Sequence, residues 1–584
     1  MSNDHLSGSE IVLRALKDQG VDLVFGYPGG VTLPLYDAIY KQNWLRHIVT
    51  RHEQGAMHAA EGYARSTGKA GVVLVTSGPG ATNTVTGLTD AMMDSVPLVC
   101  ITGQVPTQII GNDAFQEADT TGITRSCTKH NYLVKDVGNL ARIIHEAFYV
   151  ATQGRPGPVV IDLPKDVILG HGPYLGPEKV KLESYKPQVK GDIKRIEKAV
   201  KLMAGAKRPI LYCGGGVVNS GPAASKRLAQ LVRATGFPCT LTLMGLGAFP
   251  ASDRQFVGML GMHGTYEANM AMHECDVMVC IGARFDDRIT GRLDSFSPDS
   301  KKIHIDIDPS SINKNVMVDI GIVGDVGKVL EDMNRVWKST RSKADAGALK
   351  KWWKRIDAWR KRDCLAYKKS GAKPKPQYVL ERLRELTAGE DVFVTTDVGQ
   401  HQMWAAQFLR FDKPNRLMTS GGLGTMGYGL PAAIGVQFAH PGAKVVVITS
   451  DCSFQMNLQE LATVRQHNLP VKIVILNNGY MGMIRQWQEL FYEKRYSESA
   501  MDSLPDFIKL AEAYGIKGVA AGAPGEVNPA LKKMLAGDGP FILNVNVDPN
   551  ENVFPMIAAG AAHNEMIFAP DEEPEGAQED VMLA

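Results

Sequence analysis

Short, continuous runs of apolar residues alternate with amphipathic stretches along most of this 584-residue chain. Examples are Pro209–Cys213, Val277–Ile281 and residues 444–449, each followed by a turn rich in Gly, Asp or Ser. Continuous apolar runs are typical of strands buried on both faces of a parallel sheet, whereas half-exposed strands alternate apolar and polar residues. The alternation therefore predicts an α/β protein built from doubly wound parallel sheets.

Two shifts in composition divide the chain. The first, around residues 170–191, is rich in Pro and Gly, and the second, around residues 335–377, is rich in Lys and Arg. Neither region shows the short apolar runs of the segments on either side, so we interpret both as connections between domains. The predicted domains are 1–185, 190–340 and 375–560, followed by a tail at 561–584.

Charge and cysteine content narrow the class of protein. Lys and Arg total 64 against 62 for Asp and Glu, and a net charge of +2 gives no reason to expect a nucleic acid or a membrane as partner. The basic stretch 350–369 is interpreted as a solvated helix between two domains, with Trp353 and Ile356 turned inward. The eight cysteines form no CxxC pair, which favours reduced thiols in a cytoplasmic protein over a zinc site.

The most informative pattern lies in residues 444–480. A strand is followed by Ser-Asp-Cys-Ser, a helix, a second strand and then Asn-Asn-Gly. Parallel strands joined by a helix end at the same edge of a sheet, so Asp451 and Asn478 are expected side by side. A carboxylate, an amide oxygen and a backbone carbonyl suit Mg²⁺ as ligands. Substrate phosphates and water usually complete the coordination shell of this ion. The alternative is an ordinary strand–turn–helix with Asp451 as the helix cap.

A second pattern lies near the N-terminus. Arg51-His52-Glu53-Gln54-Gly55-Ala56 follows a short strand and begins a helix, and the glycine-containing turns at 27–30 and 76–80 follow other strands of the same domain. Glycines at such turns let a ligand approach the backbone closely. On this fragment alone, Glu53 is equally well explained as a helix-start residue that interacts with the helix dipole.

These pieces, together with the run GGLGTMGYG at 421–429, resemble the thiamine-diphosphate-dependent enzymes. The resemblance implies that Glu53 hydrogen-bonds the aminopyrimidine ring, that Met426 forces the cofactor to bend, and that the Gly424 carbonyl accepts from its exocyclic amine. Ser450 and Cys452 stand where the family usually has glycine. The residues implied for thiamine diphosphate are Glu53, Gly424, Met426, Asp451, Cys452, Ser453 and Asn478, and those implied for Mg²⁺ are Asp451, Asn478 and the carbonyl of Tyr480.

Three further runs are more specific: GQVP at 103–106, AFQEAD at 114–119 and GMIRQWQ at 482–488. With them, residues 5–570 resemble the catalytic subunits of the acetohydroxyacid synthases, also called acetolactate synthases. Such enzymes decarboxylate pyruvate on thiamine diphosphate and ligate the hydroxyethyl group to a second keto acid. Pyruvate gives 2-acetolactate and 2-oxobutanoate gives 2-aceto-2-hydroxybutanoate, the first common step of valine, leucine and isoleucine biosynthesis.

The resemblance also assigns roles around the substrates. Phe115 and Gln116 would lie beside the reacting carbons, and Glu53, Gly30 and Lys165 complete the implied catalytic group. Met483, Trp487 and Arg284 would form the pocket for the second keto acid. An indole packs against an alkyl group and a guanidinium binds a carboxylate, which suits Trp487 and Arg284 to a 2-keto acid.

Several predicted strands of the middle domain end in Gly or Asp, which suits binding of a dinucleotide, although none is followed by GxGxxG. By resemblance this domain holds FAD, as a structural group or an ancestral remnant, because the reaction has no net redox step. The alternative is a middle domain that has lost its cofactor. The implied FAD residues are Arg155, Gly214, Gly215, Gly216, Met262, His263, Gly264, Thr265, Gly282, Arg284, Asp286, Arg288, Asp306, Ile307, Asp325 and Val326.

Glu53 and the metal ligands lie in different predicted domains, and the family joins them across a subunit boundary. We therefore expect a homodimer or tetramer, with a separate small regulatory subunit as a further possible partner. The competing interpretations are a thiamine- and FAD-dependent enzyme of the pyruvate oxidase kind and a catalytically silent nucleotide-binding regulatory protein. Residues 552–567 are candidates for a segment that closes over the site, and the acidic end at 571–580 is expected to be disordered.

Overall fold

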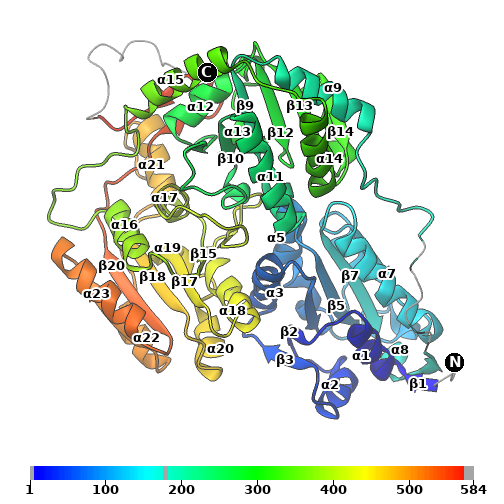
Figure 1. The fold of residues 1–584 in the computed structure, drawn as a ribbon. Helices are drawn as coiled ribbons and strands as arrows, with labels where there is room; N and C mark the ends of the chain where they lie inside the picture. The colour runs from blue at the N-terminus through cyan, green and yellow to red at the C-terminus, as the bar shows by residue number, and fades with distance from the viewer. Residues whose placement is uncertain (1–4, 175, 177–179, 181, 571–584) are drawn as a thin grey trace.

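The computed structural model describes residues 5–174, 176, 180 and 182–570, and three six-stranded parallel sheets dominate it (Figure 1). Helices cover both faces of each sheet, as predicted for a doubly wound α/β protein. The expected acidic disorder at 571–580 lies outside the described residues. Within the described part of the chain, no helix is both long and apolar enough to cross a membrane.

The N-terminal sheet has the strand order β3-β2-β4-β5-β7-β6, and every neighbouring pair is parallel. Crossover helices return the chain to the same edge of the sheet after each strand, so the loops after the strands gather there. The strands are β2 (Leu23–Tyr27), β3 (Arg46–Val49), β4 (Gly71–Val75), β5 (Leu98–Gln104), β6 (His130–Leu133) and β7 (Pro158–Pro164). The main helices are α1 (Gly8–Asp18), α2 (Leu33–Tyr40), α3 (Glu53–Thr67), α5 (Val85–Asp94) and α7 (Leu140–Thr152).

The middle sheet has the order β11-β10-β9-β12-β13-β14. Its two central strands, β9 (Pro209–Cys213) and β12 (Val277–Ile281), have the bounds that the apolar runs predict, because both strands are wholly buried. The other strands are β10 (Cys239–Leu241), β11 (Phe256–Met259), β13 (Lys301–Asp306) and β14 (Ile320–Val323). The main helices are α9 (Ile193–Ala204), α11 (Pro222–Thr235), α12 (Tyr266–Glu274), α14 (Val326–Ser339) and α15 (Ala346–Arg360).

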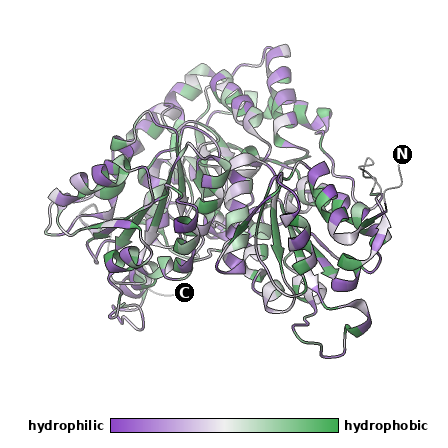
Figure 2. Ribbon diagram, turned by 90° about the horizontal axis from the view of Figure 1, so that it is seen from below, coloured by the Kyte–Doolittle hydropathy of each residue, from purple (hydrophilic) through white to green (hydrophobic). Residues whose placement is uncertain are grey.

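The C-terminal sheet has the order β16-β15-β17-β18-β20-β19. Its strands are β15 (Val392–Thr396), β16 (Leu417–Met418), β17 (Lys444–Ser450), β18 (Lys472–Asn477), β19 (Lys517–Ala521) and β20 (Phe541–Asn546). Its helices include α16 (Pro376–Leu386), α17 (Gln400–Phe408), α18 (Gly429–Ala439), α20 (Leu461–Gln466), α21 (Gly482–Phe491), α22 (Phe507–Ala513) and α23 (Pro524–Ala536). The apolar strands of this sheet and of the other two form the interior of the ribbon in Figure 2.

Two short antiparallel pairs were not predicted. Strand β1 (His5–Ser7) pairs with β8 (His171–Pro173), which ties the start of the chain to the end of its first domain. Strand β21 (Met556–Ile557) pairs with β22 (Met566–Ile567) in the C-terminal segment. Strands of two or three residues are too short to produce a periodic apolar pattern, so the sequence carries no signal for them.

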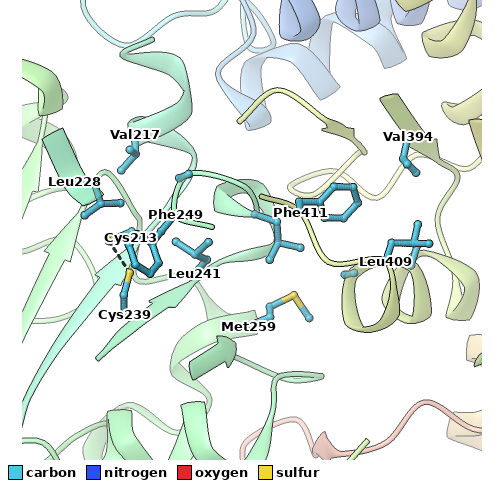
Figure 3. Packing of buried hydrophobic residues seen from close by; sticks show 14 of the residues in the cluster. Cys213, Val217, Leu228, Cys239, Leu241, Phe249, Met259, Val394, Leu409 and Phe411 are labelled. Atoms are coloured by element: carbon cyan, nitrogen blue, oxygen red, sulfur yellow. Dashed lines mark hydrogen bonds between the residues drawn. The ribbon is translucent and has the colours of Figure 1, made fainter. Parts of the chain in front are cut away.

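The middle and C-terminal domains share one apolar core (Figure 3). Side chains from strands and helices of the middle domain meet those from the first strand and following helix of the C-terminal domain. Continuous burial across the boundary means that the two domains are packed against one another rather than linked loosely. The residues labelled in the figure are Cys213, Val217, Leu228, Cys239, Leu241, Phe249 and Met259 on one side, and Val394, Leu409 and Phe411 on the other.

The interpretation of the basic stretch needs one correction. Ile356 in α15 is fully buried, as predicted, but Trp353 is only half-buried, and Trp352 is the indole that enters the core. Trp352 donates from Nε1 to the Pro209 carbonyl at 2.9 Å, and Trp353 donates to the Gly236 carbonyl at 2.9 Å. Neighbouring residues of a helix point about 100° apart. The sequence pattern could not tell which of the two adjacent tryptophans faces the core.

Candidate active site

A cavity of about 1260 Å³ lies between the middle and C-terminal domains, next to the C-terminal end of α5. Loops that follow strands of both sheets form its walls. In open α/β sheets ligands bind outside the carboxyl ends of the strands, so this is the position in which the fold favours a large ligand.

Asp451 lies at the end of β17, where the short helix α19 (Asp451–Phe454) begins. Its side chain is fully buried, and its Oδ2 accepts a hydrogen bond from the backbone N–H of Gly479 at 2.9 Å. No described residue donates to the other oxygen, Oδ1, although it is buried. Burial raises the pKa of this carboxyl to about 6. A buried carboxylate oxygen without a protein hydrogen-bond partner is suited to binding a cation.

Asn478 follows β18, and hydrogen bonds to both its side-chain oxygen and its side-chain nitrogen fix the orientation of its amide. Its Oδ1 accepts from the backbone N–H of Tyr480 at 3.1 Å, and its Nδ2 donates to Gln400 Oε1 at 3.2 Å. Because β17 and β18 are neighbouring parallel strands, Asp451 and Asn478 end beside one another, as predicted. Asn478 and Tyr480 line the cavity, as do Ser450 and Cys452 on either side of Asp451.

The two residues that replace the usual glycines have a local explanation. The Ser450 hydroxyl accepts from the Ser453 N–H at 3.3 Å and lies 2.9 Å from the Ser453 hydroxyl, so Ser450 caps α19. Ser453 is buried beneath this cap. Cys452 is nearly buried, and burial raises the pKa of its thiol to about 12. Position 452 therefore presents a small neutral group to the cavity.

Gly424 and Met426 also line the cavity, in the loop between β16 and α18. Gly424 has a φ of 77°, a left-handed conformation that favours glycine. A Cβ there would have no neighbour nearer than 3.8 Å, so the backbone faces open space. The Ser420 hydroxyl accepts from the N–H groups of Gly424 and Thr425 at 3.0 and 2.8 Å, which fixes the shape of the loop.

Most residues predicted for FAD lie on the middle-domain wall of the same cavity. Gly214, Gly264 and Thr265 do not line it. A Cβ on Gly214 would approach the Gly282 carbonyl to 2.6 Å, so this glycine serves close packing beneath the wall. The predicted residues that line the cavity are Arg155, Gly215, Gly216, Met262, His263, Gly282, Arg284, Asp286, Arg288, Asp306, Ile307, Asp325 and Val326.

Polar groups on this wall are held by neighbouring loops. Arg155 donates to the Ser95 hydroxyl at 2.8 Å and lies 3.5 Å from the carboxylate of Asp308. Burial raises the pKa of Asp306 to about 6 and lowers the pKa of His263 to about 4, so His263 is neutral at pH 7. The wall therefore presents both hydrogen-bonding groups and charge to a ligand.

The three residues predicted for the second keto acid line the cavity too. Met483 and Trp487 project from α21, and Arg284 follows β12 of the middle domain. The Trp487 ring is half-buried and packs edge-on against Phe491, with 5.8 Å between ring centroids. The structure therefore brings Asn478, Tyr480, most of the predicted flavin residues and the three predicted acceptor residues of one chain to a single cavity.

The remaining predicted catalytic residues form a second group, which does not line this cavity. Glu53 begins α3 directly after β3, and Asn83 donates to its Oε2 at 2.9 Å. Gln116 has a φ of 60° and its backbone lies against Gly78, while Phe115 is 89% exposed. Gly30 and Lys165 follow β2 and β7 at the same edge of the N-terminal sheet.

Sequence reasoning missed many residues of the cavity wall, among them Gln400, His401 and Asp94. Gln400 and His401 begin α17 after β15, and Asp94 ends α5. Burial lowers the pKa of His401 to about 3, so its ring stays neutral. The run Asp397-Val398-Gly399-Gln400 after an apolar strand is the same strand–glycine–helix signal that was used elsewhere, and it could have identified this turn.

Three sequence models of thiamine pyrophosphate enzymes match the chain. They are the N-terminal TPP binding domain at residues 6–123, the central domain at 196–333 and the C-terminal TPP binding domain at 397–545. Together with the three sheets and the cavity at the carboxyl ends of the middle and C-terminal ones, these matches define a thiamine pyrophosphate enzyme.

Full-length relatives narrow this class. The chain is 50% identical over 572 residues to "Acetolactate synthase isozyme 3 large subunit" of Escherichia coli (strain K12), covering 97% of this chain and 99% of that protein. It is 49% identical to "Acetolactate synthase large subunit" of Haemophilus influenzae, with 97% and 99% covered, and 46% identical to "Acetolactate synthase" of Mycobacterium bovis, with 97% and 92% covered. The chain belongs to the acetolactate synthase family.

Proposed function

We propose that the chain decarboxylates pyruvate and ligates the resulting two-carbon unit to a second 2-keto acid, giving 2-acetolactate from pyruvate or 2-aceto-2-hydroxybutanoate from 2-oxobutanoate. These products begin the common route to branched-chain amino acids. The observation that carries the proposal is the position of Asn478, which lines the same cavity as Trp487 and Arg284. The buried Asp451 carboxylate binds the same turn through the Gly479 N–H.

The residues present fit Mg²⁺ and thiamine diphosphate. Asp451 Oδ1 is a buried oxygen without a partner among the described residues, and Asn478 is oriented by Gln400 and Tyr480. Asp451, Asn478 and the Tyr480 carbonyl would hold the metal, with Cys452 and Ser453 near the diphosphate. When bound, thiamine diphosphate supplies a carbon nucleophile and an acceptor for the electrons that decarboxylation releases.

The chain's own residues would orient this cofactor and move its protons. The Gly424 carbonyl would accept from the exocyclic amine, and the Met426 side chain would support the bent cofactor. Glu53 would exchange a proton with the aminopyrimidine ring nitrogen, a task that suits a carboxylate held in place by Asn83. Gln116 and Phe115 lie on the same edge as Glu53, where they would contact the substrate.

FAD would occupy the middle-domain side of the cavity. Support comes from the volume of about 1260 Å³ and from the polar residues Arg155, Asp306 and Asp325 along that wall. The ligation has no net redox step, so these residues would bind FAD as a structural group. Arg284 lines the cavity with Trp487 and lies close enough to Asp286 and Asp306 to offset part of the rise that burial causes in the pKa of each. Its guanidinium would bind the keto-acid carboxylate while Trp487 packs on the alkyl group.

We also propose that two chains form each site. Glu53 and Gln116 belong to a group at the edge of the N-terminal sheet, apart from the cavity. Exposed apolar residues accompany both groups, with Leu33 and Phe115 on one and Leu423 and Ile484 on the other. Such surfaces mark contacts between proteins, which favours a homodimer or a tetramer built from it. The relatives named "large subunit" make a separate small subunit a further partner to test.

The eight cysteines are all free and buried, which fits the reducing environment of the cytoplasm. We therefore include a cytoplasmic location in the proposal.

A turnover assay under nitrogen tests the reaction. Purified protein receives pyruvate, thiamine diphosphate, Mg²⁺ and FAD, and acetolactate is measured after conversion to acetoin. We expect product without any electron acceptor, and its loss in Glu53→Gln. Acetate formed only with an artificial electron acceptor would instead favour the pyruvate oxidase alternative. Absence of both products, with and without the small subunit, would support the silent regulatory alternative and overturn the proposal.

A further inference from the structure

Two aspartates of the N-terminal domain bind the loop at residues 420–425 of the C-terminal domain. Asp94, at the end of α5, accepts from the N–H of Gly421 at 2.9 Å through Oδ2 and from the N–H of Gly422 at 2.7 Å through Oδ1. Asp90, one turn earlier, accepts from the Ser420 hydroxyl at 2.5 Å. The loop that carries Gly424 is therefore held from a different domain, more than 300 residues away in sequence.

The bond to Asp90 fixes the direction of the Ser420 hydroxyl. A hydroxyl has one hydrogen and two lone pairs. Ser420 donates its hydrogen to Asp90, and its oxygen accepts from the N–H groups of Gly424 and Thr425. The hydrogen and both lone pairs of the Ser420 hydroxyl are therefore in use. A change at Asp90 would reorient this hydroxyl, whose oxygen holds the backbone at Gly424.

Buried groups on α3 support the two aspartates from behind. Arg65 donates to Asp94 Oδ2 at 2.5 Å and to the Thr419 carbonyl at 2.7 Å. His58 lies 2.9 Å from Glu61 Oε1 and 4.0 Å from Asp90 Oδ2, and all three side chains are fully buried. Burial raises the pKa of Glu61 and of Asp90 well above the usual range.

The loop also approaches α5 too closely for larger residues. A Cβ on Gly422 would lie 2.9 Å from Asp94 Oδ1 and from Met93 Cβ. Asp94, Gly422 and Gly424 all line the large cavity, so this contact forms part of its wall. The same end of α5 carries Ser95, whose hydroxyl accepts from Arg155 of the same domain at 2.8 Å.

We propose that Asp90 and Asp94 are positioning residues for the reaction: they hold the loop at 420–425 so that the Gly424 carbonyl is presented to the aminopyrimidine of thiamine diphosphate. The inference rests on the proposed function for the identity of the ligand. Neither aspartate touches the cofactor in this account, since both act through the loop.

The test measures the affinity for thiamine diphosphate by quenching of intrinsic fluorescence, alongside kcat for acetolactate formation. We expect Asp94→Ala and Ser420→Ala to weaken cofactor affinity about tenfold or more, on the scale of a lost hydrogen bond to a buried charge. Excess cofactor should restore part of kcat. Asp90→Asn keeps an acceptor for Ser420 and should retain the affinity within about threefold, whereas Asp90→Ala should lose it.

The matched control is Asp136→Ala, which removes a carboxylate that accepts from Gly138 N–H at 2.9 Å far from the loop. Far-ultraviolet circular dichroism and sedimentation confirm that each variant is folded. Folded Asp94→Ala and Ser420→Ala with wild-type affinity and kcat would overturn the inference. An inactive wild type would instead contradict the proposed function, while the affinity measurement would still decide the role of the loop.

Discussion

The Asp451 carboxylate accepts a hydrogen bond from the Gly479 backbone at 2.9 Å through one oxygen, and its second oxygen has no partner among the described residues. This bond joins the loop after β17 to the turn after β18, so the carboxylate is oriented before any ligand binds. The same carboxylate is buried, so leaving its second oxygen without a hydrogen bond or a bound cation is unfavourable in free energy.

We predict that Asp451→Asn abolishes retention of thiamine diphosphate by weakening Mg²⁺ binding. The charge is lost while the shape is kept, so metal affinity should fall at least as far as it does when a group that only orients a ligand is lost, roughly 10- to 100-fold. Titration of the apoprotein with Mg²⁺ at fixed cofactor measures it. Asp538→Asn, on the exposed turn before β20, is the control and should bind normally. Unchanged metal affinity in Asp451→Asn would remove Asp451 from the metal site.

The serine cap gives a prediction about the unusual loop sequence. Ser450→Gly should remain active, because glycine is the residue that the family usually has here, and should lower stability by only a few tenths of a kcal/mol. Ser450→Ala should lower the free energy of unfolding by about 1 kcal/mol, since alanine lacks the hydroxyl that caps α19. Thermal unfolding of the apoprotein measures both. An alanine variant as stable as wild type would show that the cap contributes nothing.

Trp487 is predicted to set the preference between acceptors. Trp487→Leu removes the indole surface from the pocket and should reduce the preference for 2-oxobutanoate over pyruvate about tenfold, while acetolactate formation continues. The ratio of the two products from mixed substrates measures it. Tyr492→Leu, on an exposed side chain just after α21, should leave the ratio unchanged. The same product ratio in Trp487→Leu and wild type would place acceptor selection elsewhere.

Helices α3 and α18 pack so closely that they need glycine at the contact. A Cβ on Gly62 would collide with the Ala432 carbonyl, and one on Gly435 with the Ala59 carbonyl. Gly62→Ala should therefore lower the free energy of unfolding by about 1–3 kcal/mol. Gly525→Ala in α23 meets no atom within 4 Å and should be neutral or stabilising. Equal unfolding midpoints for the two variants would contradict this packing.

The sequence predicts the sheets well where strands are buried on both faces. Pro209–Cys213 and Val277–Ile281 have the observed bounds because every side chain in them is buried. Edge strands such as β6 (HNYL) and β19 (KGVAA) are short and partly exposed, so their composition resembles that of loops. The sequence also places Asp451 beside Asn478, since the parallel crossover rule fixes which strand ends meet.

Contacts between domains are beyond such rules. Asp90 and Ser420 meet at 2.5 Å across 330 positions of sequence, and no periodicity connects them. The same is true of the division between the Glu53 group and the cavity, which depends on how whole domains pack. Motifs predict what a strand end can bind, and domain packing determines which strand ends share a ligand.

The central claim is that Glu53 of one chain and Asp451 of another act on the same substrates. Co-expression of Glu53→Gln and Asp451→Asn chains with different affinity tags allows the mixed dimer to be purified. One of its two sites then has both residues intact, so we predict about half of the wild-type rate of acetolactate formation, although each parent is inactive. No activity above the parents in the mixed dimer would contradict a site shared between chains.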